Sequence, residues 1–254
     1  MKLITLNIWG GKVYEPVMKF LKEKAEDTDI FCFQEMTFGD EALFTPESKA
    51  RINLFSELQA ILPDFTAYKN ISKSEYFEYE QVNFDVGDAI FIKKSIKVLD
   101  HGGAYCFTEI PEGSGNGGQA TGNYEWLDFI KDEEKFTVVN IHGVWQAGTG
   151  KMDTPARIIQ SNVVKDFLSK KQGKKIICGD FNLMQDTESI KILENAGFSN
   201  LIKEYKISCT RTSFYEKPDK YADYIFTSKD IAVKDFKVLP EEVSDHSALQ
   251  LVFF

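Results

Sequence analysis

The sequence predicts an α/β fold in which two β-sheets pack face to face and helices cover their outer sides. Strand-like segments alternate with helical patterns along the chain, and the strands outnumber the helices. No Pro/Ser-rich linker or fixed repeat period interrupts the sequence. We therefore expect residues 1–254 to form a single domain, which is long enough to bury a substantial core.

The first three elements are a strand, a helix and a second strand. Residues 3–8 alternate between two faces, and apolar residues then recur at helical spacing between Val13 and Lys24. An apolar run over residues 29–35 predicts a buried strand. Further strands are predicted near residues 65–71, 87–93, 96–100, 124–131, 135–142, 174–180, 222–228, 231–239 and 248–254.

Two later helices carry recognisable end signals. One begins after Thr154, whose hydroxyl is suited to cap the first turn, and Pro155 fits the first helical position. The other covers residues 187–196 and ends at Gly197, because glycine readily takes the left-handed conformation that closes a helix. The predicted apolar face of the first of these helices consists of Ile159, Val163 and Phe167.

The connections are long and uneven, and long loops on a rigid scaffold often carry function. Residues 36–51 and 75–88 are expected to be loops, the second rich in aromatic and acidic side chains. Residues 148–151 lack the spacing of a phosphate-binding loop, and the glycine-rich residues 113–118 precede no predicted helix. Both segments are interpreted as mobile surface turns.

Composition limits the class of protein. The net charge of −9 and the pI of about 5.0 argue against a protein that coats long duplex DNA, since such binding needs many Lys and Arg contacts. The four cysteines lack metal-type spacing, so we expect reduced thiols and a cytoplasmic location. The chain opens directly into a strand, and no apolar run approaches the roughly 18 residues of a membrane helix. Secretion after removal of a signal peptide is the alternative, and we expect a monomer without an obligate protein partner.

Polar segments recur at the ends of strand-like runs, the edge of an α/β sheet where ligands bind. Some residues alone have a structural interpretation: Asn7 as a strand-end cap, Glu35 as a solvated edge residue, His142 as a buried histidine. Asp223 is harder to explain in this way, because an acid inside a strand needs a partner. The segments are Leu6-Asn7-Ile8, Gln34-Glu35, Asn140-Ile141-His142, Gly179-Asp180-Phe181-Asn182, Tyr221-Ala222-Asp223 and Ser244-Asp245-His246.

In order and spacing these segments resemble the successive motifs of the endonuclease/exonuclease/phosphatase superfamily, over residues 3–254. The superfamily includes exonuclease III-like nucleases, DNase I, deadenylases, inositol polyphosphate 5-phosphatases and neutral sphingomyelinases. The resemblance implies a four-layer α/β sandwich, with two packed mixed sheets flanked by helices, and phosphoester hydrolysis. AP endonucleases of the exonuclease III type have a tyrosine where this chain has His142. The histidine resembles the sphingomyelinase, 5-phosphatase, deadenylase and tyrosyl-DNA phosphodiesterase branches.

The chemistry of these residues fits hydrolysis assisted by a divalent cation, Mg²⁺ or Mn²⁺. Glu35 is a hard oxygen ligand of the kind that both ions prefer. Asn7 and Asp245 can complete the site, directly or through water. One or two cations would neutralise phosphate charge and stabilise the leaving oxygen.

The remaining acids and histidines fit proton transfer and charge stabilisation. Asp180, with Asn182 two residues further on, is placed to orient and deprotonate an attacking water. His246 would stabilise the charge that develops on a non-bridging oxygen, and Asp223 would fix the histidine tautomer. His142 is expected to contact the phosphate.

Further residues are candidates for substrate binding. Asn140 would support the phosphate contact as a polar neighbour. Trp9 and Trp145 can form an aromatic wall that stacks a base, packs lipid tails or merely fills a core. Arg157 and Gln160 match a pattern of several branches of the superfamily, with a surface salt bridge and a solvated amide as the alternative interpretation.

The function indicated first is a phosphodiesterase whose partner is nucleic acid or a phospholipid-like head group. A phosphomonoesterase that acts on a phosphorylated small molecule or an inositol phosphate is the alternative. An inactive binding module of the same fold is disfavoured, because a scaffold has no use for the full set of acids and histidines.

Overall fold

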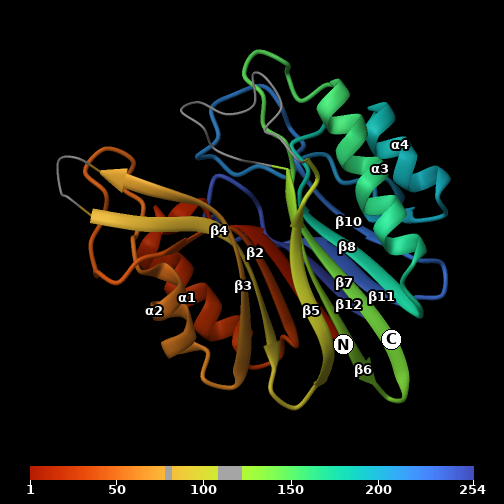
Figure 1. Ribbon diagram of the computed structural model, residues 1–254, viewed down its shortest axis with the longest axis horizontal. Helices are drawn as coiled ribbons and strands as arrows, with labels where there is room; N and C mark the ends of the chain where they lie inside the picture. The colour runs from red at the N-terminus through yellow and green to blue at the C-terminus, as the bar shows by residue number, and fades with distance from the viewer. Residues whose placement is uncertain (78–81, 108–121) are drawn as a thin grey trace.

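The structure is a computed structural model that describes residues 1–77, 82–107 and 122–254, and its strands form two six-stranded sheets (Figure 1). The first sheet has the order β11 (Val233–Val238), β12 (Leu249–Phe253), β1 (Lys2–Asn7), β2 (Ile30–Phe38), β4 (Val82–Lys93) and β3 (Phe65–Phe77). The second has the order β5 (Lys97–Tyr105), β6 (Asn123–Lys131), β7 (Glu134–His142), β8 (Lys174–Asp180), β10 (Asp223–Thr227) and β9 (Ser199–Asn200).

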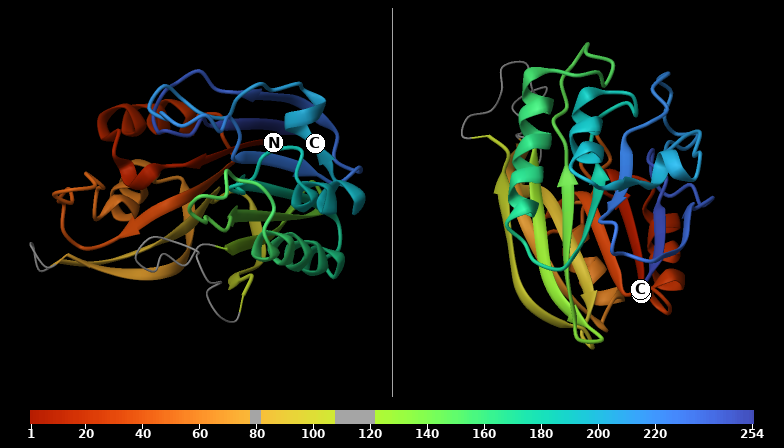
Figure 2. Two further views of the ribbon diagram at one scale, coloured as in Figure 1. Left: turned by 90° about the horizontal axis from the view of Figure 1, so that it is seen from above. Right: turned by 90° about the vertical axis from the view of Figure 1, so that its right-hand side faces the viewer.

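Both sheets are mixed and helices flank them. The β1–β2 and β7–β8 pairs are parallel, whereas their outer neighbours pair antiparallel. Helices α1 (Tyr14–Ala25) and α2 (Leu54–Ile61) cover one outer side, and α3 (Pro155–Ser169) and α4 (Glu188–Asn195) cover the other (Figure 2). This arrangement confirms the predicted four-layer α/β sandwich.

The alternation of β1 divides the core into its layers. Leu3 joins the cluster that fills the space between the sheets and continues to α3 and α4. Ile4 and Leu6 point the other way, into the cluster formed with α1 and α2. The sheet is therefore apolar on both faces, which explains why its strands read as continuous apolar runs. The amino group of Met1 donates to the Phe253 carbonyl (2.6 Å), so the two chain ends lie side by side (Figure 1).

The helix ends follow the sequence signals. The Thr154 hydroxyl accepts a hydrogen bond from the Arg157 N–H (3.3 Å) at the start of α3, with Pro155 in the first turn. Gly197 takes a φ of +95° after α4, and its N–H donates to the Glu194 carbonyl (2.9 Å). The remaining short elements are the 3-10 turn η1 (Trp9–Gly11) and α5 (Leu201–Glu204).

The predicted apolar face of α3 is wrong. Ile159 is 48% exposed, and Val163 and Phe167 only flank the core. The buried face carries two polar residues, Arg157 and Gln160. Because apolar spacing does not register buried polar residues, the predicted face is displaced by one position along the helix. The fully inward side consists of Ala156, Arg157, Gln160, Ser161, Val164 and Leu168.

The predicted loop over residues 75–88 is also wrong, since its described part belongs to the hairpin of β3 and β4. The strand predicted over residues 87–93 therefore begins earlier, at Val82, and the strand predicted over residues 65–71 continues to Phe77. Gly87 is needed where it stands: a Cβ would lie 2.0 Å from the Asn70 carbonyl oxygen. Residues 36–38 likewise extend β2, whereas α2 has no counterpart among the predicted elements. The glycine-rich residues 113–118 lie outside the described residues.

The cysteines are free, as expected, and Cys32, Cys106 and Cys178 are buried. None of the helices in the described part of the chain is long and apolar enough to cross a membrane.

Candidate functional site

The candidate residues converge where the parallel strands of both sheets end. In the second sheet, Asp180 at the end of β8 pairs in register with His142 of β7 on one side and Asp223 of β10 on the other. In the first sheet, Asn7 ends β1 and Glu35 lies in β2. Face-to-face packing of the sheets brings these two sets together, so residues far apart in the sequence form one cluster.

Asn7 joins the two sheets at the centre of the cluster. Its Nδ2 donates to Glu35 Oε1 (2.9 Å) and to Asp180 Oδ2 (3.1 Å). Its Oδ1 accepts from the Trp9 N–H (3.0 Å), which fixes the amide orientation. A single amide thus holds two carboxylates that would otherwise repel each other.

A β-bulge presents Glu35 to the site. The register of β2 against β4 shifts between Phe33 and Met36, and Glu35 has a φ of 56°. A bulge leaves one residue outside the ladder and redirects its side chain. A positive φ is costly for a residue with a side chain and is typical of functional positions. Asn182 and Lys151 at the same edge share this feature, with φ of 52° and 56°.

His246 and Asp223 form a buried pair. His246 Nδ1 lies 2.8 Å and 3.0 Å from the two Asp223 oxygens. The Thr210 hydroxyl donates to Asp223 Oδ2 (3.0 Å), which fixes the carboxylate from behind. The ring therefore carries its proton on Nδ1 when neutral, and Nε2 faces Asp180 Oδ2 at 3.6 Å.

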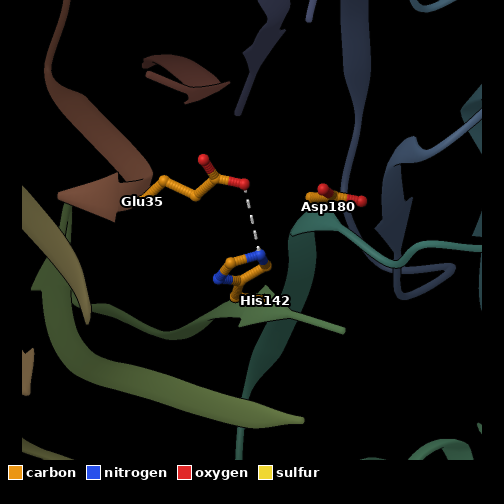
Figure 3. Close-up of side chains that lie close together, drawn as sticks. All are labelled: Glu35, His142 and Asp180. Carbon is orange, nitrogen blue, oxygen red and sulfur yellow. Dashed lines mark ion pairs between the residues drawn. The ribbon is translucent and has the colours of Figure 1, made fainter. Parts of the chain in front are cut away.

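His142 faces two carboxylates, Glu35 and Asp88. Its Nε2 lies 3.8 Å from Glu35 Oε1 (Figure 3). Its Nδ1 lies 3.6 Å from Asp88 Oδ1. The other Asp88 oxygen accepts a hydrogen bond from Asn123 Nδ2. Burial raises the pKa of Asp88 to about 7. Burial opposes charge on His142 as well, but Asp88 and Glu35 raise its pKa overall.

Asp88 is a site residue that sequence reasoning missed. It lies where the expected loop over residues 75–88 overlaps the expected strand over residues 87–93, and no burial was predicted for this acid. The signal that could have found it is an isolated acid just before the apolar run Ala89–Ile92, since a strand acid there needs a partner.

Asp180 is ionised and held in place. Burial alone would raise its pKa, but the positive charges of His246, Lys151 and Arg211 lower it below the ordinary range. The Asn182 N–H donates to Asp180 Oδ1 (2.8 Å). The Asn182 side-chain Nδ2 donates to the Gly143 carbonyl (3.1 Å) and so ties the β8 end to the loop after β7.

The donor atoms fit a divalent cation. Ligand atoms of Glu35, His142 and Asp180 all lie within 4.8 Å of one another. Asp180, Asp223 and His246 form a second group with the same spacing. Carboxylates dominate both groups, and Mg²⁺ and Mn²⁺ favour such hard oxygen ligands.

Asp245 lies at the rim of this cluster. Its Oδ1 is 4.0 Å from His246 Nε2, and its Oδ2 pairs with Arg211 Nη1 (3.2 Å). Burial raises the pKa of Asp245. The adjacent Ser244 hydroxyl donates to the Asn7 carbonyl (2.7 Å), which attaches this segment to the end of β1.

The predicted substrate contacts divide into two groups. Asn140 and Arg157 are fully buried. Asn140 Nδ2 donates to the Phe33 carbonyl (3.0 Å) and so links the sheets, while Arg157 Nε donates to the Val144 carbonyl (3.1 Å). Trp9 and Trp145 are half-buried on the turns after β1 and β7.

Gln160 supports the same loop as Arg157. Its Oε1 accepts from the Val144 N–H (2.7 Å). The alternative of a surface salt bridge and a solvated amide is wrong for this pair, because both side chains are buried and bind the loop backbone.

Lys151 and Arg211 are further site residues that sequence reasoning missed. Lys151 is only 6% exposed, and the Arg211 side chain is 5% exposed. Both cations lie over the Tyr215 ring, at 5.5 Å and 4.0 Å from its centroid. Lys151 was assigned to a surface turn because its surroundings lack phosphate-loop spacing, and spacing carries no information on burial.

Comparison with solved structures shows the same fold in other proteins. A mannosyl-6-phosphatase of Bacteroides thetaiotaomicron has a TM-score of 0.71 and 15% identity, over 100% of this chain and 99% of that chain. D. rerio TDP2 complexed with a single-strand DNA product has a TM-score of 0.68 and 15% identity, over 100% and 98%. An endonuclease/exonuclease/phosphatase protein of Beutenbergia cavernae has a TM-score of 0.77 and 14% identity, over 100% and 71%.

Sequence comparison identifies the family directly. No curated protein is significantly similar to this chain in sequence. The sequence model described as Endonuclease/Exonuclease/phosphatase family matches residues 4–246, which include the motifs from Asn7 to His246. The chain therefore belongs to the endonuclease/exonuclease/phosphatase family.

Proposed function

We propose that this protein is a divalent-metal-dependent phosphoester hydrolase that acts as a phosphodiesterase on nucleic acid or on a phospholipid-like head group. The observation that carries the proposal is the position of Asp180. This ionised carboxylate lies between Asn7, which connects it to Glu35, and Nε2 of a histidine paired with Asp223. A base, a cation-binding group and a proton donor thus lie next to one another in the buried part of the site.

Glu35 is the residue that would hold Mg²⁺ or Mn²⁺, with Asp245 at the rim and with Asn7 orienting the Glu35 carboxylate through its Nδ2. The bound ion would neutralise phosphate charge and stabilise the leaving oxygen. Glu35 and Asp180 both accept hydrogen bonds from the Asn7 amide, so the ion would lie beside two carboxylates whose negative charges repel each other.

Asp180 orients the attacking water and accepts its proton. The Asn182 N–H holds one Asp180 oxygen, which leaves the other directed toward the site. The lowered pKa keeps this carboxylate ionised across the neutral range, so it can accept a hydrogen bond from water. A lowered pKa also weakens the carboxylate as a base, and a bound cation would assist by making the water more acidic.

The histidines face the phosphate from two sides. His246, with Asp223 on Nδ1, presents Nε2 toward Asp180 and so donates to a non-bridging oxygen when protonated. His142, between Asp88 and Glu35, provides a second donor. Asn140 and Arg157 act behind these contacts, by holding the strand ends and the loop that present them.

A phosphomonoesterase is the second candidate, because one specific observation favours it. Lys151 and Arg211 add positive charge beside Asp180, and a phosphomonoester carries more negative charge than a diester. The solved neighbours are compatible with either substrate class: one is named a mannosyl-6-phosphatase, and another contains a single-strand DNA product.

A substrate panel tests the proposal. Single- and double-stranded DNA, abasic DNA, RNA with a poly(A) tail, sphingomyelin, inositol phosphates and bis(p-nitrophenyl) phosphate are incubated with Mg²⁺, Mn²⁺ or EDTA. We expect hydrolysis of at least one phosphoester that requires added metal and disappears with EDTA. Asp180→Asn serves as the inactive control. Hydrolysis at full rate in EDTA, or by Asp180→Asn, would remove the mechanism, and no hydrolysis of any substrate would favour the binding module.

A further inference from the structure

Two buried cations near Asp180 have unused hydrogen-bonding capacity. Lys151 Nζ and Arg211 Nε are each buried and have no hydrogen-bond partner among the described residues. A buried ammonium without a partner is costly, since it has lost its water and gained no acceptor. Retaining such a group in the free protein indicates that an acceptor arrives with a ligand.

The loop that carries Lys151 is fixed from several directions. The Lys151 carbonyl accepts from the Met184 N–H (2.9 Å), and Arg157 Nη1 donates to the neighbouring Met152 carbonyl (2.5 Å). Lys151 itself has a φ of 56°, a strained value for a lysine. These contacts point the side chain inward, although a lysine on a surface turn would normally extend into water.

Arg211 is fixed on a different segment of the chain, beside His246. Its backbone forms an isolated bridge with His246, and its Nη1 pairs with Asp245 Oδ2 (3.2 Å). The Tyr215 ring packs against the guanidinium and also lies below Lys151. The two cations therefore pack against the same aromatic ring, next to the acids and histidines of the site.

We propose that Lys151 and Arg211 form an anion subsite that binds negative charge beyond the single charge of a phosphodiester. A phosphodiester has one negative charge over two non-bridging oxygens, and His142, His246 and a bound cation already address these. A third anionic oxygen would accept hydrogen bonds from the two unpaired donors beside Tyr215, Lys151 Nζ and Arg211 Nε. This inference rests on the proposed hydrolase function and narrows its substrate class.

Electrostatics support the assignment. Burial lowers the pKa of Lys151 to about 8, with Asp180 opposing and Arg211 adding to that effect. Lys151 therefore remains mostly protonated at pH 7, and an anion bound next to it would stabilise the charged form further.

The extra anionic oxygen has two chemical sources, and matched substrates distinguish them. A phosphomonoester carries it on the scissile phosphate, so p-nitrophenyl phosphate is compared with bis(p-nitrophenyl) phosphate. A neighbouring phosphate can also supply it, so a thymidine dinucleotide is compared with and without a 5′-phosphate. The enzyme is assayed with Mg²⁺ as wild type, Lys151→Gln, Lys151→Arg and the surface control Lys191→Gln.

We expect Lys151→Gln to lower kcat/KM for at least one extra-charge substrate by roughly 10- to 100-fold, the usual effect of a lost charge-assisted hydrogen bond. The loss on its singly charged partner should be at least about tenfold smaller, Lys151→Arg should recover part of the loss, and Lys191→Gln should match wild type. Equal losses on both members of each pair would overturn the subsite, and so would no loss on any substrate.

Phosphate binding separates failure of the subsite from failure of the hydrolase proposal. Inorganic phosphate is titrated calorimetrically into wild type and Lys151→Gln, with Mg²⁺ and with EDTA. We expect weaker phosphate binding by Lys151→Gln in both conditions, even if no substrate is hydrolysed. Unchanged phosphate affinity would instead assign Lys151 a structural role.

Discussion

The two histidines of the site differ in how firmly each is held by its carboxylate. His246 Nδ1 lies at hydrogen-bond distance from Asp223, and Thr210 fixes that carboxylate in turn. His142 lies 3.6 Å from Asp88, too far for a direct hydrogen bond. We therefore expect His246 to depend on its acid for tautomer and orientation, whereas His142 interacts with Asp88 through charge.

The first residue-scale prediction concerns the His246–Asp223 pair. Asp223→Asn should lower kcat by roughly 10²- to 10⁴-fold, because the amide favours the wrong tautomer. His246→Ala should cost as much or more, and the double variant should add little to the worse single one. Steady-state kinetics on the best substrate of the panel measure all three. Losses that multiply fully would show that the residues act independently.

The second residue-scale prediction concerns Asp88 and pH. A carboxyl whose pKa is raised on folding binds more protons in the folded state, so its stabilising effect is present at low pH and is lost as pH rises toward about 7. His142, also with a raised pKa, acts in the same direction. The free energy of unfolding in EDTA should therefore fall between pH 5 and pH 8.

Urea denaturation of wild type and Asp88→Asn measures this effect. The variant should show a smaller fall over that range, whatever its absolute stability, because it lacks the titrating carboxyl. An identical pH dependence in the two proteins would mean that Asp88 does not titrate over this range and would contradict the argument.

At the scale of the element, the end of β8 depends on backbone conformation as much as on side chains. Gly179 has a φ of +127°, and a Cβ there would lie 2.2 Å from the Ile141 carbonyl oxygen of β7. This close approach lets β7 and β8 present His142 and Asp180 in register. The Gly-Asp-Phe-Asn segment therefore ends a strand in a backbone conformation that requires its glycine. The interpretation as a simple turn does not account for this requirement.

The prediction for this element is a loss of stability. Gly179→Ala should lower the free energy of unfolding by about 3 kcal/mol or more, since it combines a backbone clash with strain. Gly197→Ala is the matched control: φ is +95° there, but nothing lies within 4 Å of the added Cβ, so a cost of about 1–2 kcal/mol is expected. Equal costs in denaturant unfolding would contradict the argument.

Strands and helices with clear periodicity could be predicted from the sequence, whereas the burial of polar side chains around the site could not. Strands β1, β7 and β8 carry apolar runs that end in polar residues, so both strand and site residue were visible. Helix α3 buries Arg157 and Gln160, which bind the backbone of a loop, and β4 buries Asp88. These buried polar residues interrupt the apolar pattern from which burial is predicted. Burial of Lys151 depends on tertiary contacts to Met184 and Tyr215, which no local pattern encodes.

At the scale of the whole molecule, a chain with a net charge of −9 concentrates buried positive charge at one place. An acidic surface repels a polyanion, while Lys151 and Arg211 attract one local phosphate. Recognition is therefore expected to involve the reacting phosphate and its immediate neighbours, with few contacts along a nucleic-acid backbone.

Salt dependence tests this expectation on any nucleic acid that the enzyme cleaves. Each phosphate neutralised on duplex DNA lowers log K by about 0.9 per log unit of salt, so two cations give a slope of about −2. We expect the affinity for the substrate, measured between roughly 50 and 200 mM salt, to follow a slope no steeper than this. Lys151→Gln should make the slope shallower by about one unit, whereas Lys191→Gln should leave it unchanged, because Lys191 is an exposed residue of α4. A slope steeper than about −5 would show that many surface lysines contact the backbone, and the local-recognition argument would then fail.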